Sequence, residues 1–163
     1  MQKPLKNYAF IDSQNVNLGV QDLGWKLDWL KFRIYLKEKY AVEKAYMFMG
    51  YLKENQKFYN SLINYGYTMI FKEIIKNKHG KIKGNCDAEL VLQAMIDYNN
   101  YEKCIIATGD GDFACLVKYL KKQGKLEKLI VPNINKYSVL LKKASGKELY
   151  YLNELQQILS WEK

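Results

Sequence analysis

The sequence predicts an α/β fold, a three-layer α/β/α sandwich with a central, mainly parallel sheet. Short apolar segments alternate with segments of helical periodicity along almost the whole chain. Strands that are apolar nearly throughout are typical of a parallel sheet covered by helices on both faces. The 163 residues match the size of one domain, and no stretch rich in Ser, Gly or Pro suggests a linker. We therefore expect a single domain over residues 1–163, with a core of about 7–145 and a C-terminal helix of about 152–161.

In the first half of the chain, apolar runs predict strands, and apolar residues at a helical period predict helices. The first strand ends in an acidic residue, and Gly66 ends the second helix. The expected elements, in order, are a strand at 8–12, a helix at 27–40, a strand at 44–50, a helix at 54–65 and a strand at 67–71. The segment 72–84 is polar and basic, and 78–81 is expected to form a turn.

The second half repeats this alternation. Val91, Ala94 and Tyr98 lie on one helical stripe, and Phe113, Leu116, Val117 and Leu120 follow the spacing of an amphipathic helix. The expected elements are a helix at 86–99, a strand at 103–108, a helix at 113–120, a strand at 128–132 and short helices at 137–143 and 152–161.

Acidic residues are expected at one edge of the sheet. Asp12 ends the first strand, and Asp110 and Asp112 follow the fourth. The crevice at the carboxyl ends of the strands is where open α/β sheets bind ligands. If the first and fourth strands are neighbours, all three carboxylates face this crevice.

The residues around these aspartates have both a chemical and a structural interpretation. Asn15 could orient the Asp12 carboxylate or hold a phosphate or water, although Asp and Asn are also common in plain turns. After the fourth strand, Asp112 could be a helix N-cap and Asp110 a turn residue. That alternative does not require Asp110, and two carboxylates so close in the chain repel each other unless a cation or proton lies between them.

A fourth aspartate, Asp87, lies near the start of the helix expected at 86–99. It is either a site residue or a carboxylate that the helix N-terminus favours. Glu89 lies about 200° further round that helix and points in a different direction. We therefore expect Glu89 to be solvated or to support the site from outside.

Taken together, these carboxylates predict a site for Mg²⁺ or Mn²⁺, because both ions prefer hard oxygen ligands. Carboxylate sites of this kind activate water and neutralise a phosphodiester in its transition state. The single histidine, His79, lies in a polar loop, so no Ser/His/Asp or Cys/His set can be assembled. The phosphate-binding sequences GxxxxGK[ST] and GxGxxG do not occur.

The formal net charge of +9 suits a polyanionic partner, with nucleic acid first among the candidates. Lys83 and Lys136, with Ser138 beside the latter, are candidates for holding a phosphate backbone without reading sequence. The alternative is that such lysines only solvate the surface. Trp25 and Trp29 could stack on bases, although packing is the commoner use of tryptophan.

The sequence also suggests where the protein works. The N-terminus is short and polar, and no apolar run approaches the ~18 residues of a membrane span, so we expect a cytoplasmic protein with no membrane partner. Cys86, Cys104 and Cys115 lack metal-site spacing and are expected to be buried free thiols. Assembly into a homo-oligomer stays open.

Three segments resemble the motifs of the NYN family, PIN-like nuclease domains that include LabA-like bacterial proteins. Ile11–Asn15 matches an Ile-Asp-x-x-Asn motif that ends a first strand. Lys83–Asp87 matches a Lys-Gly-x-x-Asp motif that opens a central helix, and Thr108–Phe113 matches a Ser/Thr-Gly-Asp-x-Asp-Phe motif. Their order and spacing agree over about residues 7–145, and three motifs in register are far more specific than one.

The resemblance implies metal-dependent cleavage of RNA at a PIN-like site. By match, Asp12, Asp87, Asp110 and Asp112 would be the catalytic metal ligands for Mg²⁺ or Mn²⁺. Asn15 and Thr108 would support them. The sequence departs from the family pattern where many members carry a further acid, because Gln93 stands there; Glu89 and Asp97 are the possible substitutes.

Two other functions remain open at this stage. The high basic charge and the departures from the family pattern are compatible with a non-catalytic module that binds RNA, a nucleotide or a protein. A phosphatase of the haloacid dehalogenase type would need Asp-x-Asp at the end of the first strand. Gln14 occupies the second of these positions, which argues against that class.

Overall fold

The computed structural model describes residues 6–76, 79, 82–83 and 85–163. In this part of the chain, six strands form one parallel sheet in the order β3-β2-β1-β6-β7-β8. These strands are β1 (Asn7–Asp12), β2 (Val42–Gly50), β3 (Tyr67–Lys72), β6 (Cys104–Ala107), β7 (Leu126–Val131) and β8 (Leu149–Tyr151). A separate antiparallel ribbon pairs β4 (Ile75–Lys76) with β5 (Ile82–Lys83).

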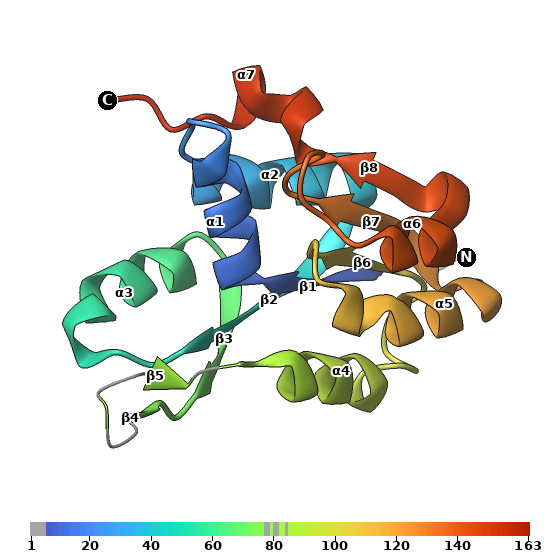
Figure 1. Cartoon of the computed structure of the whole chain (residues 1–163), viewed down its shortest axis with the longest axis horizontal. Coiled ribbons are helices and arrows are strands. Elements are labelled where there is room, and N and C mark those ends of the chain that lie inside the picture. Colours follow the sequence, from blue (N-terminus) through green and yellow to red (C-terminus); the bar gives the residue numbers. More distant parts are fainter. Residues whose placement is uncertain (1–5, 77–78, 80–81, 84) are drawn as a thin grey trace.

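Helices cover both faces of the sheet (Figure 1). The α-helices are α1 (Ser13–Asp22), α2 (Trp29–Tyr40), α3 (Gln56–Asn64), α4 (Asp87–Ile96), α5 (Ala114–Lys122), α6 (Val139–Ser145) and α7 (Gln156–Leu159). Short 3₁₀ turns span Lys53–Asn55, Gly111–Phe113, Gly146–Glu148 and Leu152–Leu155. Helices α1, α2, α3 and α7 contribute to one buried cluster, and α4, α5 and α6 contribute to the other.

Alternation along the strands explains why the sheet separates two cores. Along β1, Ile11 packs into the cluster with α1 and α2, whereas Phe10 packs into the cluster with α4 and α5. Neighbouring side chains of a strand point to opposite faces, so a strand buried on both faces must be apolar throughout. The predicted three-layer fold with a parallel sheet is therefore confirmed.

Helix α1, strand β8 and the short strands β4 and β5 were not expected from the sequence. Helix α1 begins directly after Asp12, where a polar turn was expected. The sequence did not predict this helix because most of its residues are polar, and only Val16 and Val20 are buried apolar residues. Strand β8 has three half-buried residues at the edge of the sheet, too few to give an alternating pattern. Of the turn expected at 78–81, the structure describes only His79, which lies exposed in a turn.

Three further expectations can be compared with the packing. Trp25 and Trp29 are both 8% exposed and belong to the core, so they do not form an exposed surface for stacking bases. No disulfide joins the three cysteines, all of which belong to the described part of the chain. All three were expected to be buried, but only Cys104 is; Cys86 is half-buried and Cys115, on α5, is exposed. No helix in the described residues is long and apolar enough to cross a membrane.

Candidate metal centre

The first half of the candidate site is formed where two central strands end side by side. Strands β1 and β6 pair in parallel with Ile11 opposite Ala107, so the next residues, Asp12 and Thr108, reach the same edge of the sheet. The buried Thr108 hydroxyl donates a hydrogen bond of 3.0 Å to Oδ2 of Asp12. The adjacency that the strand-end argument requires is therefore present.

The loop after β6 is held by three side-chain hydrogen bonds. The backbone N–H of Gly109 donates to Oδ1 of Asn15 at 2.7 Å, and the N–H of Asp110 donates to Oγ1 of Thr108 at 3.1 Å. Oδ1 of Asp110 accepts from the N–H of Asp112 at 2.9 Å, which caps the 3₁₀ turn Gly111–Phe113. Asp110, and not Asp112, is therefore the capping residue, so the alternative that made Asp112 the N-cap is wrong.

Ser138 braces this loop from α6. Its N–H donates to the carbonyl of Gly109 at 3.2 Å, and its Oγ caps α6 by accepting from the N–H of Leu140 at 3.2 Å. A Cβ on Gly111 would lie 2.5 Å from Oγ of Ser138, so this contact requires glycine. Ser138, expected to bind substrate, is thus placed against the Asp110 loop as a structural support.

The third carboxylate comes from the opposite side of the crevice. Asp87 is the first residue of α4, and its N–H donates to Oδ1 of Asn85 at 2.7 Å. Asp12, Asp87 and Asp110 each offer one oxygen, and these three oxygens lie within 4.8 Å of one another. We call these residues the aspartate trio. Ligand atoms this close are compatible with coordination of one cation.

The electrostatics of the trio reflect its crowding. The pKa of Asp12 is raised from 3.8 to about 6, first by burial and then by the charges of Asp87 and Asp110. The hydrogen bond from Thr108 and one from the backbone of Asn15 act in the opposite direction. Burial likewise raises the pKa of Asp87, with the charges of Asp110 and Asp112 adding to the effect. A bound cation would relieve this repulsion.

Asp112 lies outside the trio. Its carboxylate is not among the three converging ligands found in the described residues, yet it lies close enough to contribute to the raised pKa of Asp87. Asp112 thus affects the trio through its charge and is not one of the converging ligands in this structure.

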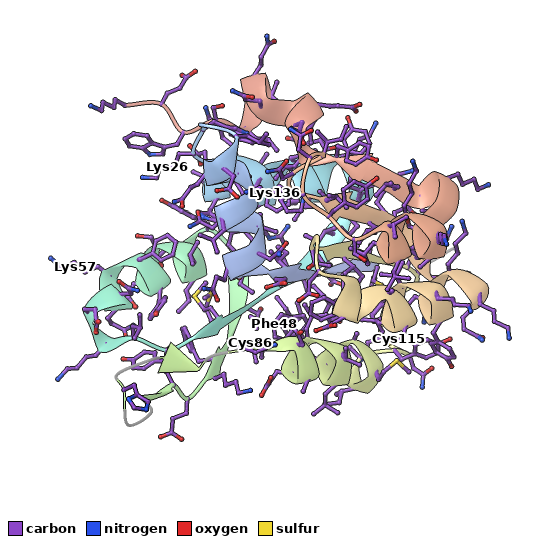
Figure 2. The ribbon with its side chains drawn as sticks, in the orientation of Figure 1. Lys26, Phe48, Lys57, Cys86, Cys115 and Lys136 are labelled. Atoms are coloured by element: carbon purple, nitrogen blue, oxygen red, sulfur yellow. The ribbon has the colours of Figure 1, made fainter. Side chains whose placement is uncertain are left out.

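The trio opens into a small crevice of about 190 Å³. Figure 2 shows Phe48 and Cys86 close together where the end of β2 meets the start of α4. The crevice is lined by Asp12, Gln14, Asn15, Leu18, Phe48, Met49, Asn85, Cys86, Asp87 and Asp110. The sequence did not indicate Gln14, Met49 or Asn85, because nothing in their local pattern marks them as site residues.

The expected substrate-binding lysines lie in different settings. The Nζ of Lys136 lies 3.1 Å from Oδ2 of Asp22, the last residue of α1, and both side chains are well exposed. The side chain of Lys83 falls outside the described residues. Lys72 lies near the start of α4. Its Nζ donates to the carbonyl of Asn85 at 2.6 Å and lies 3.5 Å from Oε1 of Glu89.

The two substitutes considered for the missing acid do not join the trio. Asp97 is buried at the far end of α4, where it accepts hydrogen bonds from Tyr46 at 2.5 Å, Gln93 at 2.9 Å and Asn100 at 3.1 Å. Burial disfavours its charge, but these hydrogen bonds outweigh that effect and lower its pKa. Glu89 pairs with Lys72 instead. Both carboxylates therefore have structural partners away from the three converging oxygens.

Comparison with known proteins identifies the domain. The NYN domain model matches residues 7–150. The chain belongs to the NYN domain family. Its sequence is 28% identical over 131 residues to the low amplitude and bright protein LabA of Synechococcus elongatus, covering 73% of this chain and 69% of that protein. The resemblance stated from the three motifs is therefore confirmed.

The fold of this NYN domain also agrees with a solved structure. A crystal structure of VPA0982, a protein of unknown function from Vibrio parahaemolyticus, superposes with a TM-score of 0.80 at 20% identity. The superposition covers 99% of this chain and 100% of the other. At this identity the likeness supports the fold alone, and the NYN match supplies the link to a nuclease family.

Proposed function

We propose that this NYN domain is a metal-dependent ribonuclease that hydrolyses a phosphodiester bond at the aspartate trio. The observation that carries the proposal is the convergence of one oxygen each from Asp12, Asp87 and Asp110 within 4.8 Å. The family match supports a nuclease, and the net charge of +9 suits a polyanionic substrate.

The donor set fits Mg²⁺ or Mn²⁺. The three converging groups are carboxylates, which are hard oxygen ligands, and neither an imidazole nor a thiolate is among them. The raised pKa of Asp12 indicates that the ionised trio is costly without a counter-charge. When bound, such a cation would supply Lewis-acid polarisation of the phosphate and a more acidic water.

The protein's own contribution is to hold the carboxylates in place and, through the Thr108 hydroxyl, to offset part of the effect of burial on Asp12. Thr108 donates to Asp12 and accepts from the backbone of Asp110, so one hydroxyl ties two members of the trio together. Asn15 accepts from Gly109 and fixes the loop that carries Asp110. These contacts preorganise the ligands, so little rearrangement is needed when the substrate binds. We assign Asn15 and Thr108 as positioning residues.

The remaining expected residues enter the proposal in supporting parts. Asp112 adds negative charge beside Asp87. Lys83 and Lys136 are proposed to bind the phosphate backbone of the substrate, and Lys72 to do so near the start of α4. Ser138 supports the Asp110 loop. RNA is the proposed polyanion because the NYN family is related to ribonucleases of the PIN type.

The decisive test is cleavage of end-labelled RNA by the purified protein with Mg²⁺ or Mn²⁺. Asp12→Asn and Asp110→Asn should each lower the cleavage rate at least about 100-fold, because they remove metal ligands. Glu38→Gln is the matched control, since Glu38 is an exposed carboxylate on α2. Thermal melting must show that all three variants fold. Asp12→Asn and Asp110→Asn proteins as active as the wild type would refute the mechanism.

Two further measurements separate the alternative of a non-catalytic RNA-binding module. The net charge of +9 is the observation that favours it. Such a module would bind RNA with a steep salt dependence, take up no Mn²⁺ and leave the RNA intact. Titration with Mn²⁺ and a filter-binding assay across salt concentrations therefore discriminate between the two functions.

A further inference from the structure

A second pocket, which we call the side pocket, adjoins the crevice of the aspartate trio. It has a volume of about 340 Å³, within the range of small-ligand sites. Gln14 and Met49 line both cavities, so the two lie side by side. The side pocket lies among the starts of α1 and α2, the end of β2 and helix α3. It is lined by Ser13, Gln14, Asn17, Trp29, Met49, Gly50, Leu52, Asn55, Phe58, Tyr59 and Ile74.

The chemistry of its walls restricts the ligand. Aromatic side chains of Trp29, Phe58 and Tyr59 meet the amides of Asn17 and Asn55 in one cavity. No Lys or Arg of the described side chains lines it, so these walls offer no positive charge for a phosphate. Among the hydrogen bonds of the described residues, none uses the side-chain amide of Gln14, Asn17 or Asn55. A flat, neutral ring with donors and acceptors on its edge satisfies both features.

An exposed group of aromatic rings continues from this pocket. Tyr51, Phe58 and Phe71 are 40%, 45% and 37% exposed, and they surround the buried ring of Tyr59. The ring centroid of Tyr59 lies 4.7 Å from that of Phe71 and 6.3 Å from that of Phe58. Half-exposed aromatic rings of this kind are the surfaces on which proteins stack unpaired bases.

We propose that the side pocket binds one unpaired nucleobase of a single-stranded RNA whose phosphate lies at the aspartate trio. This inference rests on the proposed function, and it specifies the substrate as single-stranded. A base paired within a duplex is stacked and cannot enter a side cavity, whereas an unpaired base can be turned out of the strand. Phe58 supplies the stacking face, and the amides of Asn17 and Asn55 meet the edge of the base.

The test measures binding without cleavage. A fluorescently labelled ten-nucleotide RNA, the same strand in a duplex, and an abasic strand of equal length are titrated with the protein in EDTA. In EDTA the trio holds no metal ion in any of the proteins compared, so differences in RNA affinity between them do not come from metal binding. The wild type should bind the single strand at least about ten-fold more tightly than the abasic strand, a difference typical of a stacked base.

Two variants and a control locate the effect. Phe58→Ala removes the stacking ring, and Asn17→Leu replaces an amide with an apolar group at the pocket wall. Each should weaken binding of the natural strand about ten-fold and leave binding of the abasic strand unchanged. Ile63→Ala is the matched control, because Ile63 is 50% exposed on α3 but does not line the pocket.

The outcomes separate this inference from the proposed nuclease activity. Equal affinity of the wild type for natural and abasic strands would overturn the base pocket, as would equal losses for both strands in the Phe58→Ala and Asn17→Leu proteins. Tighter binding of the duplex would also overturn it. Cleavage that depends on Asp12 could still be observed in each case, so the pocket can fail while the ribonuclease proposal stands.

Discussion

Thr108 and Asp12 join the two central strands through a hydrogen bond of 3.0 Å at the edge of the sheet. The same hydroxyl oxygen accepts from the backbone N–H of Asp110 at 3.1 Å. One buried side chain therefore fixes the relative position of two members of the trio. It also stabilises the ionised form of Asp12, which burial opposes.

Replacement of Thr108 tests this relationship. Thr108→Val keeps the shape but removes the hydroxyl, which leaves the N–H of Asp110 without its partner and should cost about 1–3 kcal/mol of unfolding free energy. The pKa of Asp12 should rise further, because the hydrogen bond that lowers it is lost. Chemical denaturation and Mn²⁺ titration at pH 6.5 measure both effects, with weaker Mn²⁺ binding expected. Thr108→Ser should retain most of the wild-type behaviour; equal losses in both variants would assign the effect to packing.

The raised pKa of Asp12 predicts how the stability of the metal-free protein depends on pH. This carboxyl ionises near pH 3.8 when unfolded but near pH 6 when folded, so the unfolded state releases its proton first as pH rises. The contribution of Asp12 therefore destabilises the fold progressively from about pH 4 to about pH 6 and stays constant above that.

Asp12→Asn isolates this contribution, because asparagine does not titrate. In chelator-treated buffer at pH 7.5, the variant should exceed the wild type in unfolding free energy by about 1–3 kcal/mol. The difference should shrink to roughly a third of that value at pH 4.5, because Asp12 is then protonated in the folded protein but still mostly ionised in the unfolded chain. Urea denaturation at both pH values provides the measurement, and a difference that does not change with pH would contradict the assignment.

The outline of the trio could be predicted because it depends on local pattern. Asp12 and Asp110 follow apolar strands, and parallel strands end at a common edge, so their convergence needs only the neighbouring positions of β1 and β6. Asp87 is different, because the distance of its carboxylate from Asp12 and Asp110 depends on how α4 packs against the sheet. The family motif, and not periodicity, was the signal for that residue.

What the sequence did not reveal depends on contacts between distant segments. Asp97 looked like a possible substitute ligand, but its position at the far end of α4 gives it Tyr46 of β2 as a partner. The side pocket combines residues from α1, α2, β2 and α3. No local pattern encodes such a cavity, because its shape depends on the packing distances between elements.

The hydrogen bonds of Asp97 predict that its replacement lowers the stability of the protein but leaves metal binding at the trio unchanged. Asp97→Ala leaves the buried hydroxyl of Tyr46 without its acceptor and removes the hydrogen bonds from Gln93 and Asn100, so it should lower the unfolding free energy by about 3 kcal/mol. Below the unfolding transition, Mn²⁺ affinity should be unchanged. Asp22→Ala is the control, since its exposed ion pair with Lys136 is expected to contribute less than about 1 kcal/mol.

The last prediction concerns Asp112, which the family motif includes but the trio does not. Asp87→Asn removes one of the three converging oxygens, so Mn²⁺ affinity measured by calorimetry should fall more than about ten-fold. Asp112→Asn removes only a nearby negative charge, whose attraction for the cation is weakened by solvent, so the loss should be about three-fold or less. The variant should also lower the pKa of Asp87, because the charge that helps to raise it is gone. If Asp112→Asn weakens Mn²⁺ binding as much as Asp87→Asn does, Asp112 is a direct ligand, and the site holds four carboxylates.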